Sequence, residues 1–195
     1  MAVGVFLGAG VMTREATLPA NHMAAVFDTE VVMIGLNAEP VTGIDPGAVF
    51  VPDSLLADAT PDVLVLPGGF GCRPMSSDRE VIDRIREIAS ACDGVLAIST
   101  GTLLLAATGL LDGQSAAGHW LTREELAPFG VELSEVRSSV MVGRSPRAAR
   151  RQRWRRSRCW LARSCTGPRH DASRAPEVRS PTRNHAGFRR SLDRP

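Results

Sequence analysis

The chain has 195 residues, of which 44% are hydrophobic and 23% are charged. This length is enough for one folded domain with a sizeable core, and no apolar run is long enough to cross a bilayer. The four cysteines are too few and too irregularly spaced for a disulfide framework or a zinc ribbon, and no basic, apolar leader opens the chain. We therefore expect a cytoplasmic protein that does not bind membranes.

The formal net charge of +2 combines two parts of opposite character. Residues 1–143 hold seven arginines against eighteen acidic residues, whereas residues 144–195 hold sixteen arginines against three acidic residues. Lysine does not occur anywhere in the chain. Because the composition changes abruptly near residue 144, we predict one domain over residues 1–143 and a separate arginine-rich tail over residues 144–195.

The beginning of the predicted domain alternates short β-rich runs with a helical pattern. Strands are predicted over residues 2–7 and 30–35. Between them we predict a helix over about residues 19–27, because its first residue is a proline, which suits the first turn of a helix. Glu15 then falls in the loop before this helix. Residues 41–51 predict a hairpin, and the alternation as a whole is typical of a mostly parallel sheet.

The next elements repeat the alternation. Residues 62–66 are a continuous apolar run, as expected for a strand buried on both faces, and the run ends at Pro67-Gly68-Gly69. Ser77 and Glu80 have the spacing of a capping box, and the apolar residues that follow them fall on one helical face up to Cys92. Shorter elements are predicted later in the chain: a strand over 115–120, a helix beginning at 122–125 and one or two strands over 131–142.

Ser99 stands at the turn of a predicted nucleophile elbow. Residues 94–98 form a short buried strand, and residues 100–108 form an apolar helix. Such a turn projects one side chain from the carboxyl end of a strand. Backbone N–H groups and the amino terminus of a helix lie close by, where they can bind a developing oxyanion. Ser99 is therefore the candidate nucleophile.

Four motifs follow one another along the chain: Pro67-Gly68-Gly69, Ser99-Thr100-Gly101, Thr108-Gly109-Leu110-Leu111-Asp112-Gly113 and Gly118-His119-Trp120. Their order over residues 1 to about 143 resembles the DJ-1/PfpI family of the class I glutamine amidotransferase-like superfamily. The resemblance implies a flavodoxin-like, three-layer α/β sandwich, with helices on both faces of a mostly parallel sheet. Because the closing elements of the family have no counterpart after Gly143, we expect this fold to be truncated at its C-terminal end. Two branches are most similar: isonitrile hydratase-like enzymes and the amidase-like domains of AraC-type regulators.

The resemblance also implies a catalytic site at the carboxyl edge of the sheet. It implies an acidic residue after the first strand, which Glu15 fits four residues before Pro19, although Leu18 replaces the glycine of the family pattern. It implies a histidine about twenty residues after the nucleophile, which His119 fits, and a cysteine at the elbow, where Ser99 departs from the family. The donors to an oxyanion would be Gly68, Gly69 and Thr100, and Thr100 would assist Ser99 in catalysis. No cofactor or metal is implied.

Each candidate also has a structural interpretation. The glycines suit any tight turn, Glu15 could be a solvated loop acid, and His119 could be a packed residue. A serine hydroxyl is far less acidic than a thiol, so Ser99 needs an oriented base, either His119 or Glu15, and is otherwise a relic. A Gly-x-Ser-x-Gly hydrolase pattern fits poorly, because Ala97 replaces its first glycine. Only Asp112 lies between Ser99 and His119 to complete the order Ser, Asp, His, and its connection to Ser99 is short.

Two functions from different classes remain. In the first, the chain is a degenerate or weakly active hydratase or hydrolase that acts on a small carbon–nitrogen or carbonyl substrate. In the second, it is a non-catalytic domain that binds a small molecule or a partner, derived from an AraC-type regulator. A homodimer is a candidate assembly in either case.

The tail over residues 144–195 lacks a periodic apolar face and is rich in arginine, serine and proline. Such a segment buries too little apolar surface to offset its ordering entropy, so we predict that it is largely disordered. Its composition is that of a GC-rich reading frame translated out of register, and we hypothesise a frameshift near codons 143–146. Contacts with nucleic acid are expected only through this tail.

Overall fold

The structure is a computed structural model that describes residues 1–117, 120–133 and 139–142. The role predicted for His119 and the predictions for the arginine-rich tail lie outside the described residues. The elements follow in chain order: β1 (Ala2–Leu7), α1 (Thr13–Phe27), β2 (Glu30–Gly35), β3 (Val41–Thr42), β4 (Val49–Phe50), β5 (Ser54–Leu55), β6 (Val63–Leu66), α2 (Cys72–Ser76), α3 (Arg79–Ala91), β7 (Gly94–Ile98), α4 (Gly101–Ala107), β8 (Ser115–Ala116), the 3-10 helix η1 (Trp120–Thr122), α5 (Arg123–Leu126), the 3-10 helix η2 (Ala127–Phe129), β9 (Glu132–Leu133) and β10 (Ser139–Val142).

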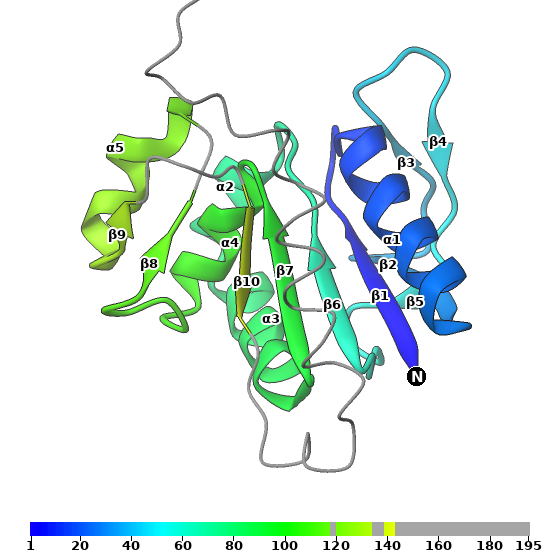
Figure 1. Cartoon of the computed structure of the whole chain (residues 1–195). Coiled ribbons are helices and arrows are strands. Elements are labelled where there is room, and N and C mark those ends of the chain that lie inside the picture. Colours follow the sequence, from blue (N-terminus) through cyan, green and yellow to red (C-terminus); the bar gives the residue numbers. More distant parts are fainter. Residues whose placement is uncertain (118–119, 134–138, 143–195) are drawn as a thin grey trace, which may run out of the picture.

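The main sheet has the strand order β10-β7-β6-β1-β2-β5 (Figure 1). The pairs β7·β6, β6·β1, β1·β2 and β2·β5 are parallel, whereas β10 runs antiparallel to β7. The three central strands β7, β6 and β1 therefore end at the same edge of the sheet. This arrangement confirms the predicted mostly parallel α/β fold.

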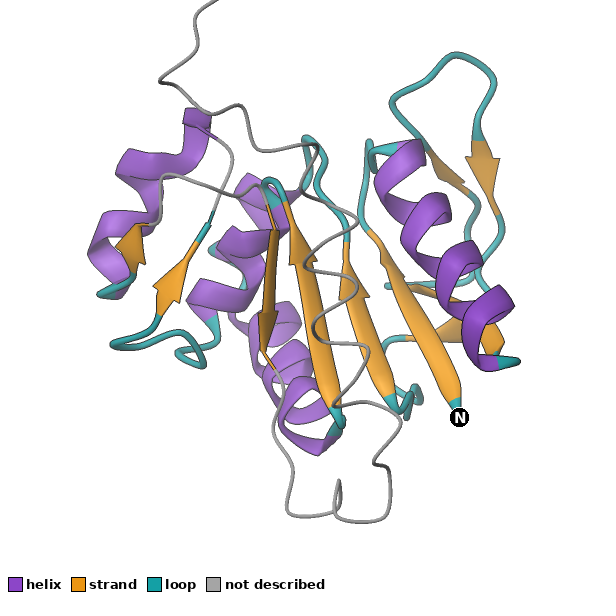
Figure 2. Ribbon diagram, in the orientation of Figure 1, coloured by secondary structure: helices purple, strands orange, loops and turns teal. Residues whose placement is uncertain are grey.

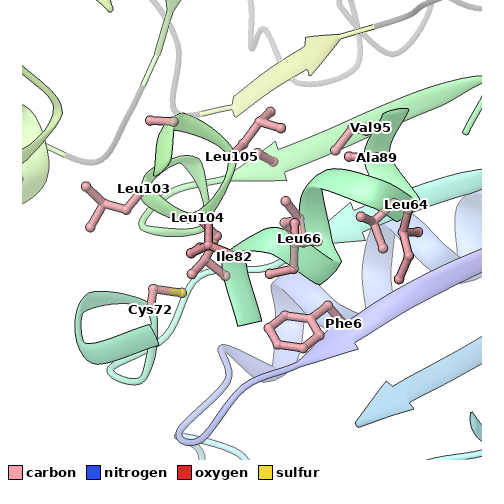
Figure 3. Close-up of a cluster of buried hydrophobic side chains, with 14 of the residues drawn as sticks. Phe6, Leu64, Leu66, Cys72, Ile82, Ala89, Val95, Leu103, Leu104 and Leu105 are labelled. Carbon is pink, nitrogen blue, oxygen red and sulfur yellow. The ribbon is translucent and has the colours of Figure 1, made fainter. Parts of the chain in front are cut away.

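Helices cover both faces of the sheet, as Figure 2 shows. One core lies between the sheet and α1, and it contains Val3, Val5 and Leu7 of β1. The other lies between the sheet and the helices α2, α3 and α4, and Figure 3 shows part of it. Residues of one strand alternate between the two cores, since Phe6 of β1 packs in the second core. Of the described helices, α1 alone packs on the first face of the sheet, so helices and sheet form the layers of a sandwich.

The short elements agree in part with the sequence. The predicted hairpin over residues 41–51 is confirmed, because β3 and β4 pair antiparallel. The region 131–142 holds β9 and β10, as predicted. Of the strand predicted over 115–120, Ser115–Ala116 form β8, whereas Trp120 begins η1 and residues 118–119 lie outside the described residues. The strand β5 and the helices α2 and η1 were not predicted. Within the described residues, no helix is both long and apolar enough for a membrane span.

The amino ends of two helices differ from the prediction. The side chain of Asp78, not of Ser77, caps α3, because the carboxylate accepts hydrogen bonds from the backbone N–H groups of Glu80 and Val81. Helix α1 begins at Thr13, so Pro19 lies inside it and Glu15 lies in its first turn instead of in a loop. A proline costs a helix one backbone hydrogen bond, which here is the bond to the Glu15 carbonyl.

Candidate functional site

Three loops meet at the carboxyl edge of the sheet. They follow β1, β6 and β7, which are neighbours in the sheet, and they lead into α1, α2 and α4. Open parallel sheets place their sites at this edge. The loop after β6 contains Gly68 and Gly69, and the turn after β7 contains Ser99. Two of the sequence motifs, Pro67-Gly68-Gly69 and Ser99-Thr100-Gly101, therefore lie together, although they are far apart along the chain.

Ser99 has the backbone conformation of a nucleophile elbow. Its φ is 55°, in the left-handed region, where a non-glycine residue costs about 1–2 kcal/mol. Strained residues of this kind concentrate at functional sites, because the surrounding structure must hold them there. The surrounding structure here is a close approach of α4 to the end of β6. A Cβ on Gly101 would overlap the carbonyl oxygen of Leu66 and lie 2.8 Å from that of Pro67. Ser99 is buried, with 8% of its surface exposed.

The loop after β1 brings Glu15 to the elbow. Backbone bonds join this loop to the loop after β6, since Met12 N–H donates to the Gly68 carbonyl at 2.8 Å and Gly71 N–H donates to the Ala9 carbonyl at 2.9 Å. Helix α1 starts directly after these contacts, so the Glu15 carboxylate in its first turn points at the loop after β6. Its Oε2 accepts a hydrogen bond from Gly68 N–H at 2.8 Å. Glu15 is therefore a member of the site and not a solvated loop acid.

Two of the three predicted oxyanion donors, Gly68 and Gly69, already have acceptors within the site. Gly68 N–H donates to Glu15, and Gly69 N–H donates to Thr100 Oγ1 at 2.8 Å. The Thr100 hydroxyl in turn lies 3.2 Å from the Gly69 carbonyl, to which it can donate. An oxyanion bound to either glycine would have to displace the Glu15 carboxylate or the Thr100 hydroxyl. The role of Gly68 and Gly69 as donors to an oxyanion stays a prediction.

The position of Gly68 defines the centre of the site. A Cβ on Gly68 would lie 2.7 Å from Glu15 Oε2, 2.8 Å from Thr100 Oγ1 and 3.1 Å from Ser99 Cβ. The three candidate side chains therefore surround one point. Only glycine leaves this point empty. Position 68 therefore requires glycine for the packing of these side chains as well as for the turn.

We predict that Gly68→Ala destabilises the protein by about 1–3 kcal/mol, because the added methyl group crowds the Glu15 carboxylate, the Thr100 hydroxyl and Ser99 Cβ. The free energy of unfolding in urea measures this. A Gly68→Ala variant that is as stable as the unmodified chain would contradict this geometry.

Two polar residues near the site were not predicted from the sequence. Cys72, the first residue of α2, is 3% exposed, and its thiol lies 3.6 Å from the Pro67 carbonyl and interacts with Thr100. Burial raises the pKa of this thiol to about 11, and the nearby Glu15 carboxylate adds to the rise. The hydroxyl of the fully buried Thr102 donates to the Ala117 carbonyl at 3.0 Å. No sequence signal marks either residue.

Both flanks of the undescribed residues 118–119 are tied to the elements of the site. Thr102 of α4 holds Ala117, as above, and Arg73 of α2 holds Leu121 and Glu125. The Arg73 guanidinium donates to both carboxylate oxygens of Glu125, at 2.7 and 3.0 Å, and to the Leu121 carbonyl at 3.3 Å. His119 itself lies outside the described residues, so its role as a base stays a prediction. In the described part of the chain, no group of three or more His, Cys, Asp or Glu residues is placed to hold a metal ion.

The fold and the elbow define an α/β protein with a nucleophile-type turn at the carboxyl edge of its sheet. The sequence pattern of the DJ-1/PfpI family matches residues 1–146, and the chain belongs to this family. A relative of known activity is the isonitrile hydratase of Pseudomonas putida, which is 31% identical over 131 residues. The aligned region is 67% of this chain and 57% of the hydratase, so the chain spans little more than half of that enzyme's length.

Solved structures show the same fold. A ThiJ/PfpI family protein from Pseudomonas syringae superposes with a TM-score of 0.66 at 21% identity, over 89% of this chain and 78% of that chain. An AraC family transcriptional regulator from Pseudomonas putida superposes with a TM-score of 0.54 at 16% identity, over 69% of this chain and 76% of that chain. At these identities the likeness concerns the fold alone.

Proposed function

We propose that this chain is a weakly active hydratase that adds water to a small, neutral carbon–nitrogen compound, with Ser99 as the nucleophile and Glu15 as the acid and base. The observation that carries the proposal is the crowding of Ser99, Thr100 and Glu15 around Gly68. The similarity to an isonitrile hydratase supports an isonitrile as the first substrate to test. The strained backbone of Ser99 supports its functional role.

The reaction can be written with this chain's own residues. The Glu15 carboxylate takes the hydroxyl proton of Ser99 while Oγ bonds to the terminal carbon of the isonitrile. The proton then passes from Glu15 to that carbon, which leaves a formimidate ester on Ser99. Water then adds across the carbon–nitrogen double bond, so the carbon gains a hydroxyl group and the nitrogen gains a proton. The bond from carbon to Oγ breaks, and the proton of that hydroxyl group returns to Ser99 Oγ. The product is the N-substituted formamide, so one water is consumed for each isonitrile.

Thr100 and Gly68 have supporting roles in this proposal. Thr100 fixes the Gly69 peptide through two contacts, to its N–H and its carbonyl. The bond from Gly68 N–H holds the Glu15 carboxylate at the turn after β6. In this proposal the carboxylate is the base that deprotonates the Ser99 hydroxyl.

The proposal is tested with the full chain and an aliphatic isonitrile, by following the appearance of the formamide. We expect slow hydration that disappears in Ser99→Ala. Hydration at the same rate by Ser99→Ala, or formation of no formamide by the unmodified chain, would contradict the proposed activity.

A second function is favoured by one observation. The Gly68 and Gly69 N–H groups are engaged by Glu15 and Thr100, so the site is already satisfied without a reacting substrate. This arrangement, together with a serine at the elbow, supports a non-catalytic domain that binds a small molecule or a partner in the same place. In that case the unmodified chain is stabilised by its ligand but converts none of it.

A further inference from the structure

We propose that Cys72 is a positioning residue, whose buried thiol holds the turn at residues 67–69 in the arrangement that Ser99 needs. The effect of Cys72 on reactivity rests on the proposed role of Ser99. Its effect on the conformation of the turn does not, because that depends only on contacts within the protein.

The contacts of Cys72 hold both ends of the turn after β6. Its Sγ lies 3.6 Å from the carbonyl oxygen of Pro67, which is the residue between β6 and the two glycines. Its backbone N–H donates to the Gly69 carbonyl at 3.3 Å. Between these contacts lies Gly68, where a Cβ would be 3.1 Å from Ser99 Cβ. Cys72 therefore holds the turn that packs against Ser99.

The position of the thiol suits a structural donor and not a second nucleophile. Cys72 belongs to the apolar core between the sheet and α2, α3 and α4, where Figure 3 shows it at the start of α2. With its pKa raised to about 11 by burial, the thiol stays protonated at neutral pH. A protonated thiol can donate to the Pro67 carbonyl but is a poor nucleophile. Its effect on the reaction must therefore pass through the turn at residues 67–69.

The chain contains a matched control for this thiol. Cys92 is also buried, with 4% of its surface exposed, and its Sγ donates to the carbonyl of Pro61 at 3.1 Å. Pro61 and Pro67 lie just before and just after β6, so the two cysteines make the same kind of bond at opposite ends of one strand. Burial raises the pKa of the Cys92 thiol as well, to about 12. Only Cys72 lies at the edge that holds Ser99.

The first test is amide hydrogen exchange in the full chain, followed at Gly69, whose N–H is bound by Thr100. We expect Cys72→Ala to speed exchange at Gly69 at least about tenfold, because the turn that carries Gly69 loses its contact at the Pro67 carbonyl. Cys92→Ala should leave this amide unchanged, and Cys72→Ser, which keeps a donor, should restore most of the protection. Unchanged exchange at Gly69 in Cys72→Ala, or equal acceleration in Cys92→Ala, would overturn the inference.

The second test links the geometry to Ser99, with a fluorophosphonate as the probe. Ser99 Oγ bonds to phosphorus, fluoride leaves and the hydroxyl proton passes to Glu15. We expect Cys72→Ala to be labelled at least about tenfold more slowly than the unmodified chain and Cys92→Ala to be labelled at the same rate. Faster exchange at Gly69 without slower labelling would overturn the link to Ser99. If the unmodified chain is not labelled, the proposed function fails, and the exchange comparison alone decides the role of Cys72.

Discussion

Ser99→Cys is expected to hydrate an aliphatic isonitrile at least about a hundredfold faster than the unmodified chain, because a thiolate is a far better nucleophile than a hydroxyl. A thiol has an ordinary pKa of about 8.5, and the amino terminus of a helix lowers that value. Position 99 lies directly before α4, so a cysteine there would be activated by its place in the fold. The measurement is the rate of formamide production as a function of pH.

The same variant separates the two functions. If the unmodified chain is slow but faster than Ser99→Ala, Ser99 is a working nucleophile and the chain is an enzyme. If formamide appears only with Ser99→Cys, the native protein is the non-catalytic binding domain. Failure of Ser99→Cys to produce any formamide would show that the elbow does not support this chemistry, whichever residue stands there.

Glu15→Gln is expected to lower the hydration rate by about a hundredfold to ten-thousandfold with little change in KM, because it removes the base from the site. The amide oxygen of glutamine can still accept the hydrogen bond from Gly68 N–H, so the free energy of unfolding should change by less than about 1 kcal/mol. Steady-state kinetics and urea unfolding of the same preparation measure both quantities.

Glu30→Gln provides a control for the loss of one negative charge. Glu30 is exposed at the amino end of β2, at the edge of the sheet opposite to the site. We expect the hydration rate of Glu30→Gln to equal that of the unmodified chain. A Glu15→Gln variant that keeps more than half of the activity would show that the base is another residue.

Much of the architecture follows from local patterns in the sequence. The bounds of β1 and β2 match the predicted runs 2–7 and 30–35, since continuous apolar segments between turn residues leave little choice of structure. The elbow was predicted for the same reason, because an apolar strand and an apolar helix meet there without a loop. Because β6 and β7 are parallel neighbours, both end at the same edge of the sheet, so Ser99 after β7 lies near Gly68 after β6.

The misplaced elements have physical causes that a single sequence hides. Pro19 suggested the start of a helix, but tertiary contacts of the loop after β1 begin α1 at Thr13 and the helix tolerates the proline inside it. Helix α2 has only five residues and contains a proline, so its helical pattern is too short to detect. Cys72 was not predicted because its thiol contact with Pro67 closes an irregular loop of five residues, which leaves no pattern in the sequence.

The assignment of Ser99 as the nucleophile is tested most directly by the site and rate of covalent labelling by a fluorophosphonate, read by mass spectrometry of the digested full chain. We expect one adduct, on Ser99, that forms at least about tenfold more slowly in Glu15→Gln, because the carboxylate that accepts the hydroxyl proton is gone. An adduct on another residue, no adduct at all, or equal rates with and without the Glu15 carboxylate would contradict it.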